Sequence, residues 1–172
     1  LLPCSLCAEQ YLDIYVSARH LDYSNVVSLC QSMSQPSELG PGIVGHCWIH
    51  LHGDGYDLTG GHTGERGLHA PIYLDGVMDL VDSGDANPVR YLWETLHDGY
   101  FQEGSGGHTP TYSARIPLSQ DQFEKIRRYI DPNLHDYSAY ALTGDQCASF
   151  VAQVAILAGV ELQHQVTVPI RR

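Results

Sequence analysis

Cys147 has the sequence surroundings that a nucleophilic cysteine needs. A thiol reacts as a nucleophile in its thiolate form, and the free amides and dipole of a helix N-terminus favour that anion. The segment from Thr143 to Gln146 matches a capping box, with Thr143 at the N-cap and Gln146 three residues later. This pattern predicts a helix from about Thr143 to Gly159, with Cys147 in its first turn. The sequence therefore makes Cys147 a candidate for thiol chemistry.

The same helix also allows a purely structural interpretation of Cys147. Apolar residues recur along it at helical spacing and form one stripe: Cys147, Phe150, Val151, Val154, Ala155 and Ala158. A cysteine at the head of such a stripe is often a small core residue. The helix taken alone leaves both interpretations open.

A histidine-rich hairpin supplies the candidate base. Residues 43–52 alternate, so that one face carries Cys47, Ile49 and Leu51 and the other carries His46, Trp48, His50 and His52. Residues 53–55 read Gly-Asp-Gly and predict a turn. A pivot at Asp54 places His62 across from His46 on the same face, and a slip of register would bring Thr63 or Thr59 there instead. A base oriented by a second polar group is the arrangement that a Cys/His hydrolase needs.

Metal binding is the sharpest rival for these histidines. His46, His50 and His62 could converge on one face as zinc ligands, but no fourth ligand stands at a clear spacing. Cys4 and Cys7 form one Cys-x-x-Cys pair without the second pair of a zinc motif. Cys47 points away from the face of His46 and is a poor partner for it. We therefore expect no metal and no cofactor.

Composition narrows the range of partners. The 172 residues carry a formal net charge of -11, which repels phosphate backbones and anionic lipid headgroups, so we expect no nucleic-acid partner. No apolar run approaches membrane-spanning length, and the first residues show no signal peptide. We expect a soluble protein without stable membrane insertion, and its location, secreted or periplasmic action included, stays open.

The remaining segments predict a single α+β domain over residues 1–172, with an N-terminal segment at 1–42 and a core at 43–160. Strands are expected at Tyr11–Ala18 and Thr111–Leu118, and a final strand at Leu162–Val168. Residues 25–33 fit a short helix or a strand. Helices are expected from Asn87 to Asp98 and, capped by Ser119, from Gln120 to Ile130. Strands and helices do not alternate regularly, which favours α+β over α/β.

Two motifs in this order resemble the circularly permuted papain-like cysteine hydrolases, which include permuted NlpC-type peptidases and lecithin–retinol acyltransferase relatives. Gly45-His46-Cys47-Trp48-Ile49 resembles their histidine strand, and residues 140–151, Tyr-Ala-Leu-Thr-Gly-Asp-Gln-Cys-Ala-Ser-Phe-Val, resemble their cysteine helix. The similarity covers roughly residues 43–160. One departure is Gln146, which stands where the group usually has asparagine.

The resemblance implies an antiparallel sheet with the nucleophile-bearing helix packed against it. It makes Cys147 the nucleophile, His46 the base and His62 the third, polar member. The backbone N–H of Cys147 would donate a hydrogen bond to the oxyanion of the tetrahedral intermediate. The residues that line the oxyanion and substrate site would be Gln146, Tyr140 and Trp48. The implied activity is acyl-enzyme hydrolysis of an amide or peptide bond, with bacterial cell-wall peptide as the first substrate.

An antibacterial effector is a natural context for such an activity, and an inhibitory partner protein would then be expected. Two alternatives stay open: a lipid acyl hydrolase or acyltransferase of the same fold, and an inactive papain-like binding domain. The second alternative rests on Gln146, which replaces the asparagine that is usual in the resembled group.

Overall fold

The computed structural model of the chain describes residues 9–18, 22, 24–33, 45–64, 95, 97, 99–141 and 144–163. Its regular elements, in chain order, are β1 (Tyr11–Ala18), α1 (Val26–Met33), β2 (Gly45–Gly53), β3 (Tyr56–Thr63), β4 (Tyr100–Glu103), β5 (Tyr112–Pro117), α2 (Gln120–Tyr129) and α3 (Cys147–Leu157).

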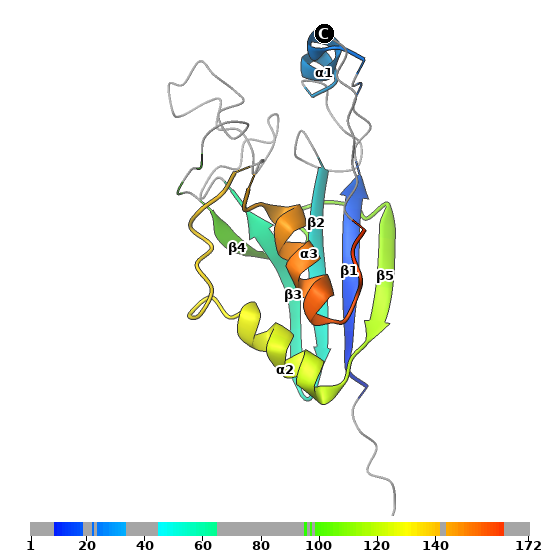
Figure 1. Cartoon of the computed structure of the whole chain (residues 1–172), viewed down its shortest axis with the longest axis vertical. Helices are drawn as coiled ribbons and strands as arrows, with labels where there is room; N and C mark the ends of the chain where they lie inside the picture. The colour runs from blue at the N-terminus through cyan, green and yellow to red at the C-terminus, as the bar shows by residue number, and fades with distance from the viewer. Residues whose placement is uncertain are drawn as a thin grey trace, which may run out of the picture.

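Five strands form one antiparallel sheet in the order β4-β3-β2-β1-β5, with β2 at its centre (Figure 1). In β1 the alternation places Leu12 on one face and Asp13 on the other. Helices α2 and α3 lie across the face that carries Leu12, which we call the inner face (Figure 1). The α+β fold class is confirmed.

The core lies between the inner face and the two helices. Its fully buried side chains come from both layers: Leu12, Ile49 and Leu51 from the sheet, Phe123 and Ile126 from α2, and Val154 from α3. Burial of this apolar surface is the main force that holds the helices on the sheet. Among the described residues, no helix is long and apolar enough to cross a bilayer.

The outer face of the sheet carries an ion pair between the buried Asp13 and the exposed Arg115. The carboxylate of Asp13 accepts hydrogen bonds from Nε and Nη2 of Arg115 at 2.7 and 2.8 Å. The Arg115 guanidinium lies 3.7 Å above the ring of Tyr11. These hydrogen bonds from Arg115 lower the pKa of Asp13, although burial opposes the shift. The pair joins β1 to β5 across their ladder, where Asp13 faces Arg115.

Replacing this carboxylate is expected to destabilise the fold. Asp13→Asn should lower the free energy of unfolding by about 1–3 kcal/mol at about pH 7, because it removes the charge that Arg115 binds twice. The pKa of Asp13 is lower in the folded chain than in the unfolded chain. Its stabilisation is therefore complete above the unfolded pKa and is lost as the pH falls through the folded pKa. Urea unfolding should show the two proteins converging below about pH 4; a constant difference down to about pH 2 would contradict this account.

The hairpin forms as predicted, but its register differs by one residue. A pivot at Asp54 would pair Ile49 with Thr59, whereas the ladder pairs Ile49 with Gly60 and Leu51 with Leu58. The turn residues Asp54 and Gly55 both have positive φ, at 51° and 72°, and this tight two-residue turn sets the register. Because a one-residue slip exchanges the faces of a strand, every β3 side chain lies on the face opposite to the expected one.

Some of the other predicted elements are confirmed, and others lie outside the described residues. The strands at residues 11–18 and 112–117 and the helix at residues 120–129 are confirmed, and Ser119 caps α2 with a reciprocal bond to Gln122. Residues 26–33 are a helix, and β4 was not predicted. The predicted helix at 87–98 and the predicted final strand at 162–168 lie largely outside the described residues, as do Cys4 and Cys7.

Candidate active site

Cys147 is the first residue of helix α3. Gln146, and not Thr143, is the N-cap: its side-chain oxygen accepts the N–H of Ala148 at 3.1 Å, and Ser149 Oγ accepts the N–H of Gln146 at 2.8 Å. The predicted start of this helix at Thr143 is therefore wrong by one turn. Cys147 consequently lies closer to the free amides of the helix than the sequence suggested, where the dipole favours an anion most.

The thiol of Cys147 lies among groups that stabilise its thiolate. A hydrogen bond from the thiol of Cys47 lowers the pKa of Cys147 well below its usual range, and the imidazole of His46 adds to this effect against the cost of burial. The same contact and burial raise the pKa of Cys47. Both cysteines are free thiols. Of this pair, Cys147 is therefore the one that ionises first.

The sequence predicts that Cys47 is a poor partner for His46, because the two side chains point to opposite faces of β2. That orientation is correct, but the inner face is the one against which α3 packs. Cys47 therefore meets Cys147 directly. The signal for this contact was present in the sequence, because a cysteine on the apolar face of a central strand must contact whatever covers that face.

Tyr140 is the second polar group beside Cys147. Its side chain is almost fully buried, and its hydroxyl is hydrogen-bonded to Cys147. Burial and the negative charge on Cys147 raise the pKa of Tyr140 well above its usual value, so the hydroxyl keeps its proton. Tyr140 therefore lies beside Cys147, where the resemblance placed it.

His46 lies near the start of β2, where it contacts Cys147 and has two aromatic rings as neighbours. Its ring stacks on Trp48, with centroids 5.8 Å apart, and the ring of His108 lies 4.9 Å away on a segment that crosses from β4 to β5 (Figure 1). His46 is 8% exposed, and its Nε2 has no hydrogen-bond partner among the described residues. A buried nitrogen without a partner is costly and calls for an explanation, such as a bound water or ion or a catalytic role.

His108 is a contact of the candidate base that the sequence did not indicate. Burial lowers the pKa of His108 to about 4, and the neighbouring His46 contributes to that shift. His108 is therefore neutral at about pH 7 and adds no positive charge next to His46. Its ring and that of Trp48 both pack against the His46 imidazole and restrict its orientation.

His62 does not pair with His46, which corrects the expected cross-strand contact. The observed register, continued along the strands, places Thr63 opposite His46 and turns His62 toward α3. There, Nε2 of His62 lies 2.9 Å from the carbonyl oxygen of Tyr137 and donates to it, and its ring meets Tyr140 edge-on at 5.2 Å. Burial lowers the pKa of His62, so it is a neutral donor.

The same correction removes the rival interpretation of His46, His50 and His62 as zinc ligands. His50 lies on the outer face and His62 on the inner face, so the three do not converge on one ion. Among the described residues, the group whose ligand atoms do converge is His50, His52 and Asp57.

Gln146 acts as a helix cap, and this role gives a test of stability. Gln146→Ala should lower the free energy of unfolding by about 1 kcal/mol, because the N–H of Ala148 loses its acceptor. Gln146→Asn keeps a capping amide and is the matched control, with stability close to that of the wild type. Thermal or urea unfolding measures both variants. A Gln146→Ala protein as stable as the wild type would show that the cap contributes nothing.

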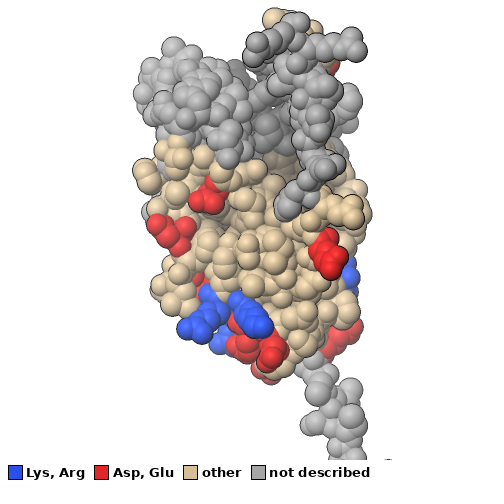
Figure 2. All heavy atoms as spheres, in the orientation of Figure 1, with Lys and Arg blue, Asp and Glu red and all other residues tan. Residues whose placement is uncertain are grey.

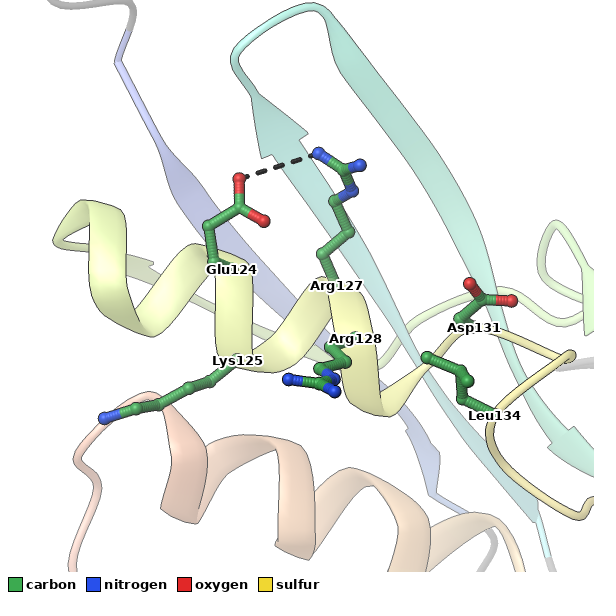
Figure 3. A pocket seen from close by; sticks show the side chains of 6 residues that line it. All are labelled: Glu124, Lys125, Arg127, Arg128, Asp131 and Leu134. Atoms are coloured by element: carbon green, nitrogen blue, oxygen red, sulfur yellow. Dashed lines mark ion pairs between the residues drawn. The ribbon is translucent and has the colours of Figure 1, made fainter.

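Two surface pockets lie near the helices. One, of about 250 Å³, is lined by His62 of β3 and by residues of both helices and the segment between them, among them His135, Asp145 and Phe150. The other, of about 380 Å³, lies on α2 between side chains of both charges, and Arg127 pairs there with Glu124 at 3.5 Å (Figure 3). Basic and acidic atoms of this second pocket are interspersed on the surface (Figure 2). It holds no nucleophile or base and does not border Cys147.

No known protein family, curated protein or solved structure matches this chain. The resemblance drawn from the two motifs therefore stays a prediction. The candidate active site rests on its geometry, in which β2 supplies His46 and Cys47, α3 supplies Cys147, and Tyr140 comes from the segment that precedes α3.

Proposed function

We propose that this chain is a cysteine-nucleophile hydrolase with a permuted papain-like fold, acting on an amide or peptide bond. One observation carries the proposal: Cys147 begins a helix beside His46, with a pKa held well below that of an ordinary thiol. Reactive cysteines are found in such electropositive positions, whereas structural cysteines in cores are inert. An antiparallel sheet with the histidine on its central strand and α3 across it supports the fold.

In the first half of the reaction, His46 takes the proton of the Cys147 thiol. The thiolate attacks the carbonyl carbon, and a tetrahedral oxyanion forms. The N–H of Cys147, which has no carbonyl partner within the helix, and the Tyr140 hydroxyl donate to that oxyanion. The C–N bond then breaks, His46 returns its proton to the leaving amine, and a thioester remains on Cys147.

In the second half, water replaces the amine. His46 removes a proton from water, and the resulting hydroxide attacks the thioester carbonyl. The C–S bond breaks, the carboxylic acid leaves, and the proton returns to the Cys147 thiolate through His46. The cycle needs no metal and no redox partner.

Two groups in this proposal act through their neighbours. Trp48 and His108 pack against the His46 ring and fix its orientation beside Cys147. His62 acts on Tyr140 and not on His46: it fixes the Tyr137 carbonyl and packs against the Tyr140 ring. We therefore assign His62 the role of a positioning residue, which holds Tyr140 beside Cys147.

Cell-wall peptide is the substrate that we propose first. The net charge of -11 disfavours polyanionic substrates, and peptide stems offer amide bonds for acyl transfer. Gln146, which departs from the resembled motif, already has a structural role as the cap of α3 and does not by itself argue for an inactive domain.

Product analysis tests this function. The protein is incubated with purified bacterial cell walls and, separately, with phospholipid vesicles, and products are identified by mass. The proposal expects a new carboxyl and a new amino terminus at one peptide bond, together with an acyl adduct on Cys147 after acid quenching. Release of fatty acid from the vesicles alone would replace the peptide substrate with a lipid. Absence of both products and of any adduct would contradict the hydrolase.

A further inference from the structure

A second cluster of ionisable side chains lies on the outer face, near the turn of the β2–β3 hairpin. His50 and His52 are two residues apart on β2 and so share a face, and Asp57 is the cross-strand partner of His52. His52 Nδ1 lies 2.6 Å from Asp57 Oδ2, and His50 Nε2 lies 3.2 Å from Asp57 Oδ1. One ligand atom from each of the three lies within 4.8 Å of the others.

These spacings fit a first-row transition-metal ion. Zn²⁺ binds imidazole nitrogen and carboxylate oxygen at about 2.0–2.2 Å, so neighbouring ligand atoms around a tetrahedral ion are about 3.3 Å apart. The observed separations of 2.6 and 3.2 Å to Asp57 are close to that value. His52 and Asp57 are 43% and 64% exposed, which leaves a path for the ion and room for water as a fourth ligand.

A carboxylate behind His50 lies where it would hold the Nδ1 proton once a metal ion binds Nε2. Asp13 is buried, and its Oδ2 lies 3.5 Å from His50 Nδ1, while Arg115 holds the carboxylate in place. A proton on Nδ1, facing Asp13, leaves the lone pair of Nε2 free on the side of Asp57. A ligating histidine whose other nitrogen faces a carboxylate is the common outer shell of protein metal sites.

The ring of Tyr11 restrains both histidines. It stacks on His52 at 4.9 Å and meets His50 edge-on at 5.7 Å. The two imidazoles therefore hold their relative orientation against a packed ring, which reduces the entropy lost when an ion binds.

We propose that His50, His52 and Asp57 form a binding site for a divalent transition-metal ion, Zn²⁺ in the first place, with Asp13 as the group that orients His50. The site lies on the outer face near the hairpin turn, whereas α3 and Cys147 lie against the inner face. It is independent of the proposed hydrolase.

Zinc binding to the full chain, freed of metal by a chelator, tests the site by calorimetry. The expected result is uptake of Zn²⁺ by the wild type with a Kd at least about tenfold lower than in Asp57→Asn or His52→Ala. Asp57 is exposed and its replacement should not disturb the fold. His97→Ala is the matched control, because it removes an exposed histidine away from the cluster and should bind as the wild type does.

Two results would overturn the site. One is a wild type that takes up no Zn²⁺; the other is a Kd that Asp57→Asn and His52→Ala leave unchanged, which would place any bound zinc elsewhere. Asp13→Asn addresses the orienting role separately: the Kd should rise about 10–100-fold while His50, His52 and Asp57 still bind. An unchanged Kd in a folded Asp13→Asn protein would overturn that role. Hydrolase activity enters none of these readouts.

Discussion

Replacement of Cys147 by serine is expected to lower the rate of amide hydrolysis at least about 10³-fold. A serine hydroxyl has a far higher pKa than a thiol, and neither the N-terminus of α3 nor His46 can ionise it to a useful extent. The two side chains differ by one atom and Cys147 lies in a buried cluster, so the fold should survive. Initial rates on the cell-wall substrate measure the loss, and an unfolding curve confirms the fold.

Cys47→Ala is the informative comparison for this loss. It keeps the nucleophile but removes the hydrogen bond that does most to lower the pKa of Cys147. Since the pKa of Cys147 rises, the rate should fall more at about pH 6 than at about pH 8, where the thiolate recovers. If Cys47→Ala were as inactive as Cys147→Ser at every pH, the assignment of Cys147 alone as nucleophile would be wrong.

Phe123→Ala is expected to produce the largest loss of stability, about 3–5 kcal/mol in the free energy of unfolding. Phe123 is fully buried in α2, in the layer between the helix and the sheet, and its ring meets that of Tyr56 edge-on at 6.1 Å. Alanine leaves a cavity that the surrounding side chains fill only in part. Urea unfolding at constant pH measures the change.

Leu134→Ala is the control for this core substitution. Leu134 is also a large apolar residue, but it is 65% exposed, and its replacement should change the free energy of unfolding by less than about 0.5 kcal/mol. Similar losses in Phe123→Ala and Leu134→Ala would show that α2 does not pack on the sheet as described.

The helices and strands whose apolar residues recur at a regular spacing, or whose ends carry a capping motif, were predictable from the sequence. β1 alternates over its whole length, and the capping box of Ser119 and Gln122 marks the start of α2. Parts of the candidate site were predictable from similar patterns. The alternation of β2 separates His46 from Cys47, and the apolar stripe of α3 begins at Cys147. Local patterns of this kind are fixed by neighbours along the chain, and they carry into the structure.

The details that depend on contacts across the chain were not predictable. A tight turn at Asp54 and Gly55 shifted the register by one residue and moved His62 to the inner face, where it meets Tyr140. Nothing in the sequence around His108 indicates that it reaches His46 across the sheet. Such contacts are set by how strands and crossing segments pack, and a single sequence carries little of that information.

The most direct test of the central claim is the rate at which iodoacetamide labels each cysteine of the native protein between about pH 5 and about pH 8, in the wild type and in His46→Ala. If His46 and Cys47 hold Cys147 as a thiolate, Cys147 should label rapidly below about pH 7, well ahead of Cys47, whose pKa is raised. In His46→Ala the labelling of Cys147 should slow sharply at the same pH. A Cys147 that labels no faster than Cys47, or at a rate independent of His46, would contradict the account.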